Sequence, residues 1–181
     1  MRKPTKAELL GAAGKRVPDV IAPGLKVLFC GINPGLYSGW AGHHFARPGN
    51  RFWPALFASG FTKRLVRPQD ECELLACGYG ITNLVERATL ASDELRRNEL
   101  VEGGEILEKK IKRYGPRAVA ILGISAYRLA FSRPKAAVGR QPEDLADSVV
   151  WVLPNPSGLN AHFTPKALAK VFREFRLSLP A

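Results

Sequence analysis

Cysteine is scarce in this sequence, which contains only Cys30, Cys72 and Cys77. The odd number, and the position of Cys30 within an apolar segment, argue against a framework of disulfide bonds. The absence of any Cys-x-x-Cys pair argues against a four-cysteine iron–sulfur cluster. Free thiols are typical of proteins in a reducing compartment, so we expect a cytoplasmic location.

Long apolar runs are missing as well. No run approaches the roughly 20 apolar residues that cross a bilayer, so we expect no membrane partner. The stretch MRKPTKAELLGAAGKR at the start is basic and lacks a continuous apolar core. For this reason we expect no signal peptide.

The usual cofactor motifs are also absent. There is no Gly-x-x-x-x-Gly-Lys loop and no Gly-x-Gly-x-x-Gly turn, so we expect no nucleotide cofactor. The absence of Gly-x-Ser-x-Gly counts against an esterase. His43, His44 and His162 do not form a metal-binding pattern, and we expect no metal. Because His43 and His44 are adjacent, we expect exposed loop residues rather than a shared site.

Acidic residues are the minority among the charged side chains. The sequence has 16 Asp and Glu against 27 Lys and Arg, a net charge of +11. Such an excess favours a polyanionic partner, with nucleic acid first and an anionic membrane second. The charge alone also fits a basic soluble protein without such a partner.

The pattern of apolar and polar segments predicts one α/β domain. Hydrophobic residues make up 46% of 181 residues, enough for a single core. Continuous apolar runs predict buried strands at 25–32, 78–85, 117–124 and 148–158. Helical patterns lie at 50–60, 92–116, 125–132 and 164–179. We therefore predict a basic arm over 1–24, then, over 25–181, a parallel or mostly parallel sheet of about four strands flanked by helices.

Two similar turns follow the first and last predicted strands. GINPG places Asn33 after the first strand, and NPSGL places Asn155 after the last. In a parallel sheet, ligands bind beyond the carboxyl ends of the strands. The two Asn-Pro turns are therefore expected to meet in one cleft.

These segments also carry a family resemblance. GINPGLYSGWAGHHFARPGNRFW, GITNLVERAT and LPNPSGLNAHF together resemble the mismatch-specific uracil/thymine-DNA glycosylases, a branch of the uracil-DNA glycosylase superfamily. The likeness runs from about residue 18 to the C-terminus. It implies a glycosylase-like α/β fold and a monomeric enzyme that needs neither metal nor cofactor.

The resemblance implies a role for each of several residues. Asn33 would orient the attacking water, and Asp93 is a candidate second activating group, although a place at a helix N-terminus explains it more simply. Backbone N–H groups near Ile32 and Phe45, together with Asn155, would bind the base. The Phe45 ring would stack on the base, and Ser38 would lie near C5.

A second group of residues is implied in binding DNA. Leu159 would fill the space left by a flipped base, with Gly158 and Asn160 beside it. The expected partner is double-stranded DNA with G·U mismatches, from which uracil and related damaged pyrimidines are hydrolysed to an abasic site without lyase activity. Two alternatives remain open: a non-catalytic mismatch-sensing module and a hydrolase of free nucleosides.

Overall fold

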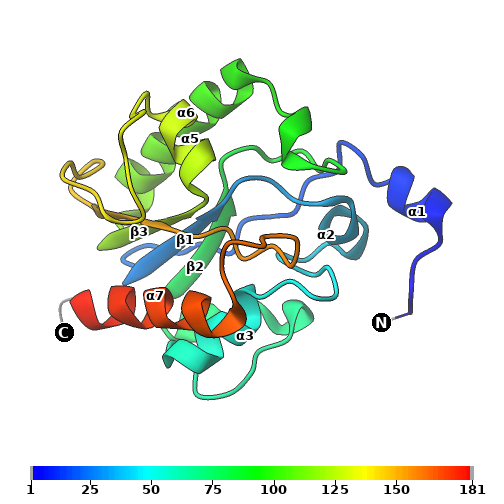
Figure 1. The fold of residues 1–181 in the computed structure, drawn as a ribbon, viewed down its shortest axis with the longest axis horizontal. Coiled ribbons are helices and arrows are strands. Elements are labelled where there is room, and N and C mark those ends of the chain that lie inside the picture. Colours follow the sequence, from blue (N-terminus) through cyan, green and yellow to red (C-terminus); the bar gives the residue numbers. More distant parts are fainter. Residues whose placement is uncertain (1, 180–181) are drawn as a thin grey trace.

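The computed structural model describes residues 2–179, and a single sheet forms its centre (Figure 1). The strand order in this sheet is β2-β1-β3-β5-β4. The strands are β1 (Val27–Gly31), β2 (Tyr79–Asn83), β3 (Ala118–Leu122), β4 (Gly139–Arg140) and β5 (Val149–Leu153). The first, second, third and fifth strands are parallel, and only β4 is antiparallel. The predicted fold class is confirmed, and the strand that the sequence did not reveal is β4, which has no apolar run.

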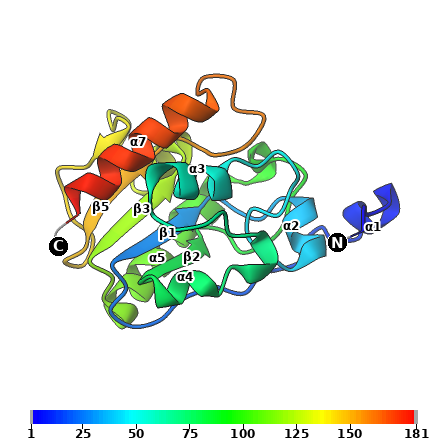
Figure 2. The same cartoon turned by 90° about the horizontal axis from the view of Figure 1, so that it is seen from below.

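Helices cover both faces of the sheet (Figures 1 and 2). The helices are α1 (Lys6–Leu10), α2 (Leu36–Ala41), α3 (Phe52–Ser59), α4 (Glu73–Ala76), α5 (Arg97–Tyr114), α6 (Ile124–Ala130) and α7 (Pro165–Ser178), with short 3-10 turns at Pro68–Asp70 and Ser92–Glu94. Helices α3 and α7 pack with Phe29 in one core, and α5 and α6 pack with Leu28 in the other. Alternate residues of β1 therefore face opposite cores, as expected of a strand buried on both sides.

Helix α5 begins later than its sequence pattern predicts. The pattern predicts a helix over 92–116, but Ser92–Glu94 form a separate 3-10 turn and the helix starts at Arg97. The Glu99 carboxylate accepts the Arg96 backbone N–H at 2.9 Å, which secures the helix N-terminus there. By contrast, the predicted start of α7 is confirmed, because the Thr164 side chain caps it and Pro165 is its first residue.

The segment before the first strand packs against the sheet. Ala12, Val17 and Val20 are buried, and Val20 forms an antiparallel bridge with Ile81 of β2. Asp19 accepts a hydrogen bond from the Thr82 hydroxyl at 2.7 Å. Whether residues 1–24 act as a separate arm stays a prediction. Their last third lies along the edge strand.

Two structural features are absent from the described residues. No helix in that part of the chain is long and apolar enough to cross a membrane. Residues 2–179 also hold no group of three or more His, Cys, Asp or Glu side chains placed to bind a metal ion.

Candidate active site

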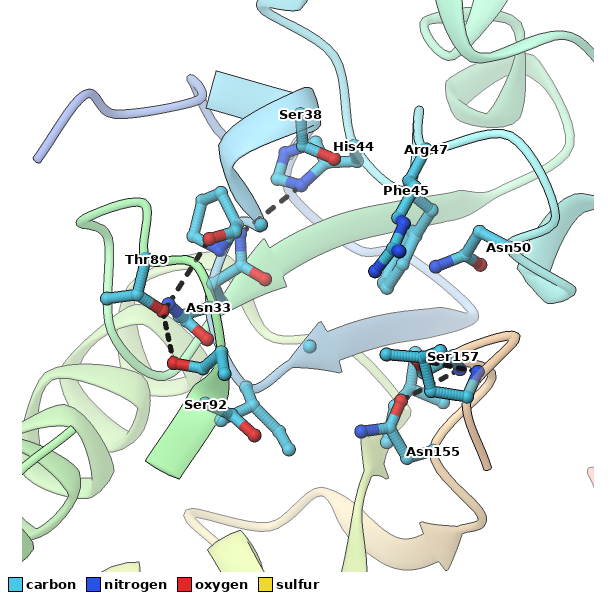
Figure 3. Close-up of a pocket in the computed structure, with 18 of the residues that line it drawn as sticks. Asn33, Ser38, His44, Phe45, Arg47, Asn50, Thr89, Ser92, Asn155 and Ser157 are labelled. Carbon is cyan, nitrogen blue, oxygen red and sulfur yellow. Dashed lines mark hydrogen bonds between the residues drawn. The ribbon is translucent and has the colours of Figure 1, made fainter. Parts of the chain in front are cut away.

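A cavity of about 390 Å³ opens at the carboxyl ends of the parallel strands. Figure 3 shows side chains that reach it from the turn after β1, the loop before α3, the segment after β2 and the turn after β5. Both Asn33 and Asn155 line it, so the two Asn-Pro turns meet as expected from the topology. No Asp, Glu or Lys is among the described residues that line this cavity.

The side-chain amide of Asn33 is held in one orientation. Its Nδ2 donates to the carbonyl oxygens of Pro34 at 3.2 Å and Arg87 at 3.1 Å. It also donates to Thr89 Oγ1 at 2.7 Å. The Thr89 hydroxyl in turn donates to the Ala91 carbonyl oxygen at 2.7 Å. All three partners of Nδ2 are thus acceptors, and no described residue donates to Oδ1, which is left as a free acceptor of this cavity-lining residue.

Asn155 presents the opposite chemistry across the cavity (Figure 3). Its Oδ1 accepts the Ser157 backbone N–H at 2.9 Å, which forms a tight turn. The Asn155 backbone carbonyl accepts from Asn160 Nδ2 at 2.9 Å. No described residue accepts from Asn155 Nδ2, so the amide offers a donor at a fixed position.

The Phe45 ring forms a flat wall of the cavity. One face stacks on Phe52 of α3, with ring centroids 4.1 Å apart and planes inclined by 28°. The Phe45 backbone has φ +52°, a left-handed conformation that costs a non-glycine residue about 1 kcal/mol or more. A Cβ at Gly31 would lie 3.2 Å from Phe45 Cζ, so the glycine leaves room for the ring.

The two residues whose backbone N–H groups are predicted to bind the base also lie at the cavity. Ile32 and Phe45 both line the cavity. Neither donates its backbone N–H to another described residue. The Ser38 hydroxyl lines the same cavity and accepts the Ala46 backbone N–H at 3.1 Å. The roles of these residues toward a base stay predictions, but the structure brings them together.

His44 contradicts the expectation of exposed loop histidines. Its side chain is buried, and burial lowers its pKa below the usual range, so the ring is neutral at pH 7. Nε2 lies 3.0 Å from the Pro18 carbonyl oxygen, which can only accept, and so Nε2 carries the proton. Nδ1 is then an acceptor, and Asn83 Nδ2 lies 3.3 Å from it.

The neutral histidine fixes the orientation of Asn83, the last residue of β2. Because Asn83 Nδ2 donates to His44, its Oδ1 is turned to the opposite side, toward Gly31. A Cβ added to Gly31 would lie only 2.4 Å from Asn83 Oδ1. Both residues line the cavity, so the floor offers a fixed carbonyl-type acceptor beside Phe45.

The turn after β5 projects an apolar side chain beyond the cavity. Leu159 is 75% exposed, although it also lines the cavity. Gly158 packs against the loop before α3, because a Cβ there would lie 2.5 Å from the Gly49 carbonyl oxygen. This contact within the protein is therefore enough to require glycine at position 158. Asn160 lines the cavity, and its Oδ1 accepts the His162 backbone N–H at 3.1 Å.

Comparison with known proteins shows the family of this chain. The family model described as the uracil DNA glycosylase superfamily matches residues 18–176. The chain belongs to the uracil DNA glycosylase superfamily. Its fold is similar to the solution structure of a Methanosarcina acetivorans protein described as a candidate uracil DNA glycosylase, with a TM-score of 0.56 and 16% identity over 90% of this chain and 98% of that one. The likeness to that structure concerns the fold.

The structure does not bring every predicted residue into the superfamily site. Asp93 lies exposed in the 3-10 turn and is not among the residues lining the cavity, whereas its neighbour Ser92 is. Sequence reasoning also missed His44, Asn83 and Thr89. Asn83 carried one available signal, since it is a polar residue at the carboxyl end of a predicted buried strand.

Proposed function

We propose that this superfamily member is a DNA glycosylase that hydrolyses the N-glycosidic bond of uracil flipped out of duplex DNA, preferentially opposite guanine. The product is an abasic site, as in the first step of base excision repair. The observation that carries the proposal is the locked amide of Asn33, whose free Oδ1 shares one cavity with the flat wall of Phe45.

The polar groups of the cavity suit the charges that develop in this reaction. As the bond between C1′ and the base breaks, the sugar becomes oxocarbenium-like and negative charge moves onto the base. Asn33 Oδ1 is neutral, so it holds a water by accepting a hydrogen bond rather than by removing a proton. The water oxygen bonds to C1′, its hydroxyl stays on the sugar and the proton leaves with the base. The free donors of Ile32, Phe45 and Asn155 stabilise that departing base.

The acceptor on the floor supports uracil as the base. Asn83 Oδ1 is held away from His44 and faces the cavity. Uracil carries a proton at N3 that this oxygen accepts, while cytosine presents a lone pair there. An unpaired acceptor inside a site is costly, so the orientation of Asn83 favours the uracil edge over that of cytosine.

The lining also supports hydrolysis without strand cleavage. Lyase chemistry requires an amine nucleophile that forms a Schiff base with the sugar. No lysine lines the cavity among the described residues. We further propose that the protein acts as a monomer in the cytoplasm, with its +11 charge attracting the DNA backbone.

A preference for G·U pairs follows from the cost of extrusion. A mispaired base is easier to unstack than a paired one, and the exposed Leu159 is placed to occupy the vacated space. Thymine and bulkier pyrimidines differ from uracil near C5, where we place Ser38.

One assay separates this function from the two alternatives. End-labelled duplexes with a single G·U pair are incubated with the protein and then treated with alkali, which cuts at abasic sites. Cleavage only after alkali supports a hydrolytic glycosylase, and cleavage without alkali would show lyase activity. Binding without cleavage would indicate a mismatch-sensing module, and release of base from free deoxyuridine alone would indicate a nucleoside hydrolase.

The matched control for that assay is Asn33→Ala. We expect it to bind the same duplex with little change and to cleave it at least about 100-fold more slowly in a single turnover, because water positioning acts in the transition state. An unchanged cleavage rate would show that Asn33 has no role in the reaction.

A further inference from the structure

The guanidinium of Arg51 binds the backbone of the loop that carries Leu159. Arg51 Nη2 donates to the carbonyl oxygens of Ser157 at 3.0 Å, Gly158 at 2.9 Å and Asn160 at 2.9 Å. Arg51 Nη1 donates to the carbonyl oxygen of Phe163. We call residues 156–163 the wedge loop. One side chain thus gathers four backbone carbonyls from a segment that has no regular secondary structure.

The backbone of Arg51 adds a fifth link to the same loop. Its N–H donates to the Pro156 carbonyl oxygen at 2.9 Å. Among the described residues, no carboxylate forms an ion pair with Arg51. Within the described part of the chain, the side-chain hydrogen bonds of the Arg51 guanidinium all go to backbone carbonyl oxygens of one loop, which indicates a structural task in this loop.

Arg51 also joins the wedge loop to the wall of the cavity. It immediately precedes Phe52, the first residue of α3, and Phe52 supports the Phe45 ring by stacking. The Asn50 side chain accepts the Phe52 N–H at 2.9 Å and fixes the turn between them. Figures 1 and 2 show the wedge loop beside the start of α3. Leu159, the proposed wedge, and Phe45, the proposed stacking ring, are therefore both connected to Arg51.

We infer that Arg51 is a positioning residue that preforms the wedge loop, so that Leu159 is already directed outward before DNA binds. The inference rests on the proposed function. The wedge loop has no β-ladder to hold its backbone. Without Arg51 it would lose conformational freedom when the base is extruded from DNA. The planar fork of arginine reaches Phe163 through Nη1 and the other three carbonyls through Nη2, whereas lysine carries all its donors on one nitrogen at the end of a flexible chain.

The test compares Arg51→Ala and Arg51→Lys with wild type on three substrates. Single-turnover cleavage is measured for uracil paired with adenine, for uracil paired with guanine, and for uracil in single-stranded DNA. A preformed wedge loop should matter most for the substrate from which uracil is hardest to extrude. We expect Arg51→Ala to lose at least about tenfold on U·A, less on G·U and no more than about threefold on single strands. Arg51→Lys should show the same order of losses.

A double-mutant cycle with Leu159→Ala isolates the positioning role. If Arg51 acts through Leu159, then Arg51→Ala should add little further loss on duplex DNA once Leu159 is already alanine. Additive losses would overturn the inference. Arg128→Ala is the matched charge control, because Arg128 also donates two bonds to a carbonyl oxygen, that of Ala136, and lies outside the cavity lining. It should change none of the three rates by more than about twofold.

Each remaining outcome has a clear meaning. Equal losses on all three substrates would show that Arg51 only maintains the fold, and full recovery in Arg51→Lys would show that only its charge matters. Either result overturns the inference. If wild type cleaves no uracil-containing DNA at all, then the proposed function itself fails. If wild type cleaves and the variants match it, only the role of Arg51 fails.

Discussion

The hydroxyl of Thr89 accepts a hydrogen bond from Asn33 Nδ2 at 2.7 Å and donates one to the Ala91 carbonyl oxygen at 2.7 Å. This arrangement decides which end of the Asn33 amide faces the cavity. It also links the turn after β1 to the segment after β2, since Leu36 N donates to the Thr89 carbonyl at 3.0 Å.

The first prediction tests that link. Thr89→Val keeps the side-chain shape but removes the acceptor, so the Asn33 amide loses its firmest anchor. We expect single-turnover cleavage of G·U duplexes to fall roughly tenfold, with DNA affinity nearly unchanged. Thr89→Ser retains the hydroxyl and should stay within about threefold of wild type. Equal cleavage rates for the valine and serine variants would show that the Thr89 hydroxyl does not contribute to catalysis.

The second prediction concerns the space at Gly31. An alanine there would place its Cβ 2.4 Å from Asn83 Oδ1 and 3.2 Å from Phe45 Cζ. We expect Gly31→Ala to displace both groups, to lower the stability by about 1–3 kcal/mol, and to reduce cleavage at least tenfold. Urea unfolding and single-turnover rates measure the two effects. A variant with normal cleavage would show that neither Asn83 nor Phe45 needs its observed position.

The third prediction concerns pH. Protonated His44 would donate from both nitrogens and could no longer accept from Asn83 Nδ2. Because the folded-state pKa lies below the usual value near 6.5, the unfolded chain takes up this proton first as the pH falls. The stability contributed by neutral His44 is therefore present at neutral pH and declines below about pH 6.5, by at most about 1.4 kcal/mol per pH unit.

His44→Gln provides the comparison for that effect. Glutamine can also donate to the Pro18 carbonyl and accept from Asn83, but it does not titrate. Between pH 7 and pH 5, wild type should lose more stability and more activity on G·U duplexes than the glutamine variant does. Parallel pH profiles for the two proteins would show that His44 does not control the site.

The fourth prediction concerns salt. If lysines and arginines neutralise several phosphates, then the logarithm of the DNA affinity should fall linearly with the logarithm of the salt concentration, with a slope of about −0.9 per phosphate. Fluorescence anisotropy with a G·U duplex gives this slope. A response close to zero would favour a protein that acts on free nucleosides.

The fifth prediction separates the two readings of Asp93. Its exposed position outside the cavity lining supports the reading as part of a turn. We expect the double variant Asn33→Ala/Asp93→Ala to cleave as fast as Asn33→Ala alone, within about threefold. Residual cleavage that disappears only in the double variant would instead establish Asp93 as a second activating group.

Sequence patterns predicted the fold well because buried parallel strands leave continuous apolar runs. The residues of β1 and β3 are all buried, and each run can be read directly. The strand β4 has only two residues and pairs at the edge, so its position depends on β5 rather than on its own composition. The start of α5 was misplaced because Ser92, Asp93 and Glu94 suit a 3-10 turn as well as a helix N-terminus.

Apart from the residues that the family resemblance implied, the candidate site could be predicted only where a motif stands at a strand end. Asn33 and Asn155 had that signal. His44 did not, because its burial depends on Pro18, Glu71 and Asn83, which come from three separate parts of the chain. The support of the wedge loop by Arg51 was equally hidden, since it links residues more than 100 positions apart.

The contact between Pro18 and His44 has a consequence for the minimum functional length of the chain. The carbonyl of Pro18 selects the tautomer of His44, and His44 in turn selects the orientation of Asn83. A shortened protein starting at residue 25 would retain every strand and helix that surrounds the cavity. It would nevertheless lose the partner of His44 Nε2 and the Val20 bridge along β2. The preference for uracil that we propose for the cavity would therefore depend on a segment that contributes none of the cavity lining.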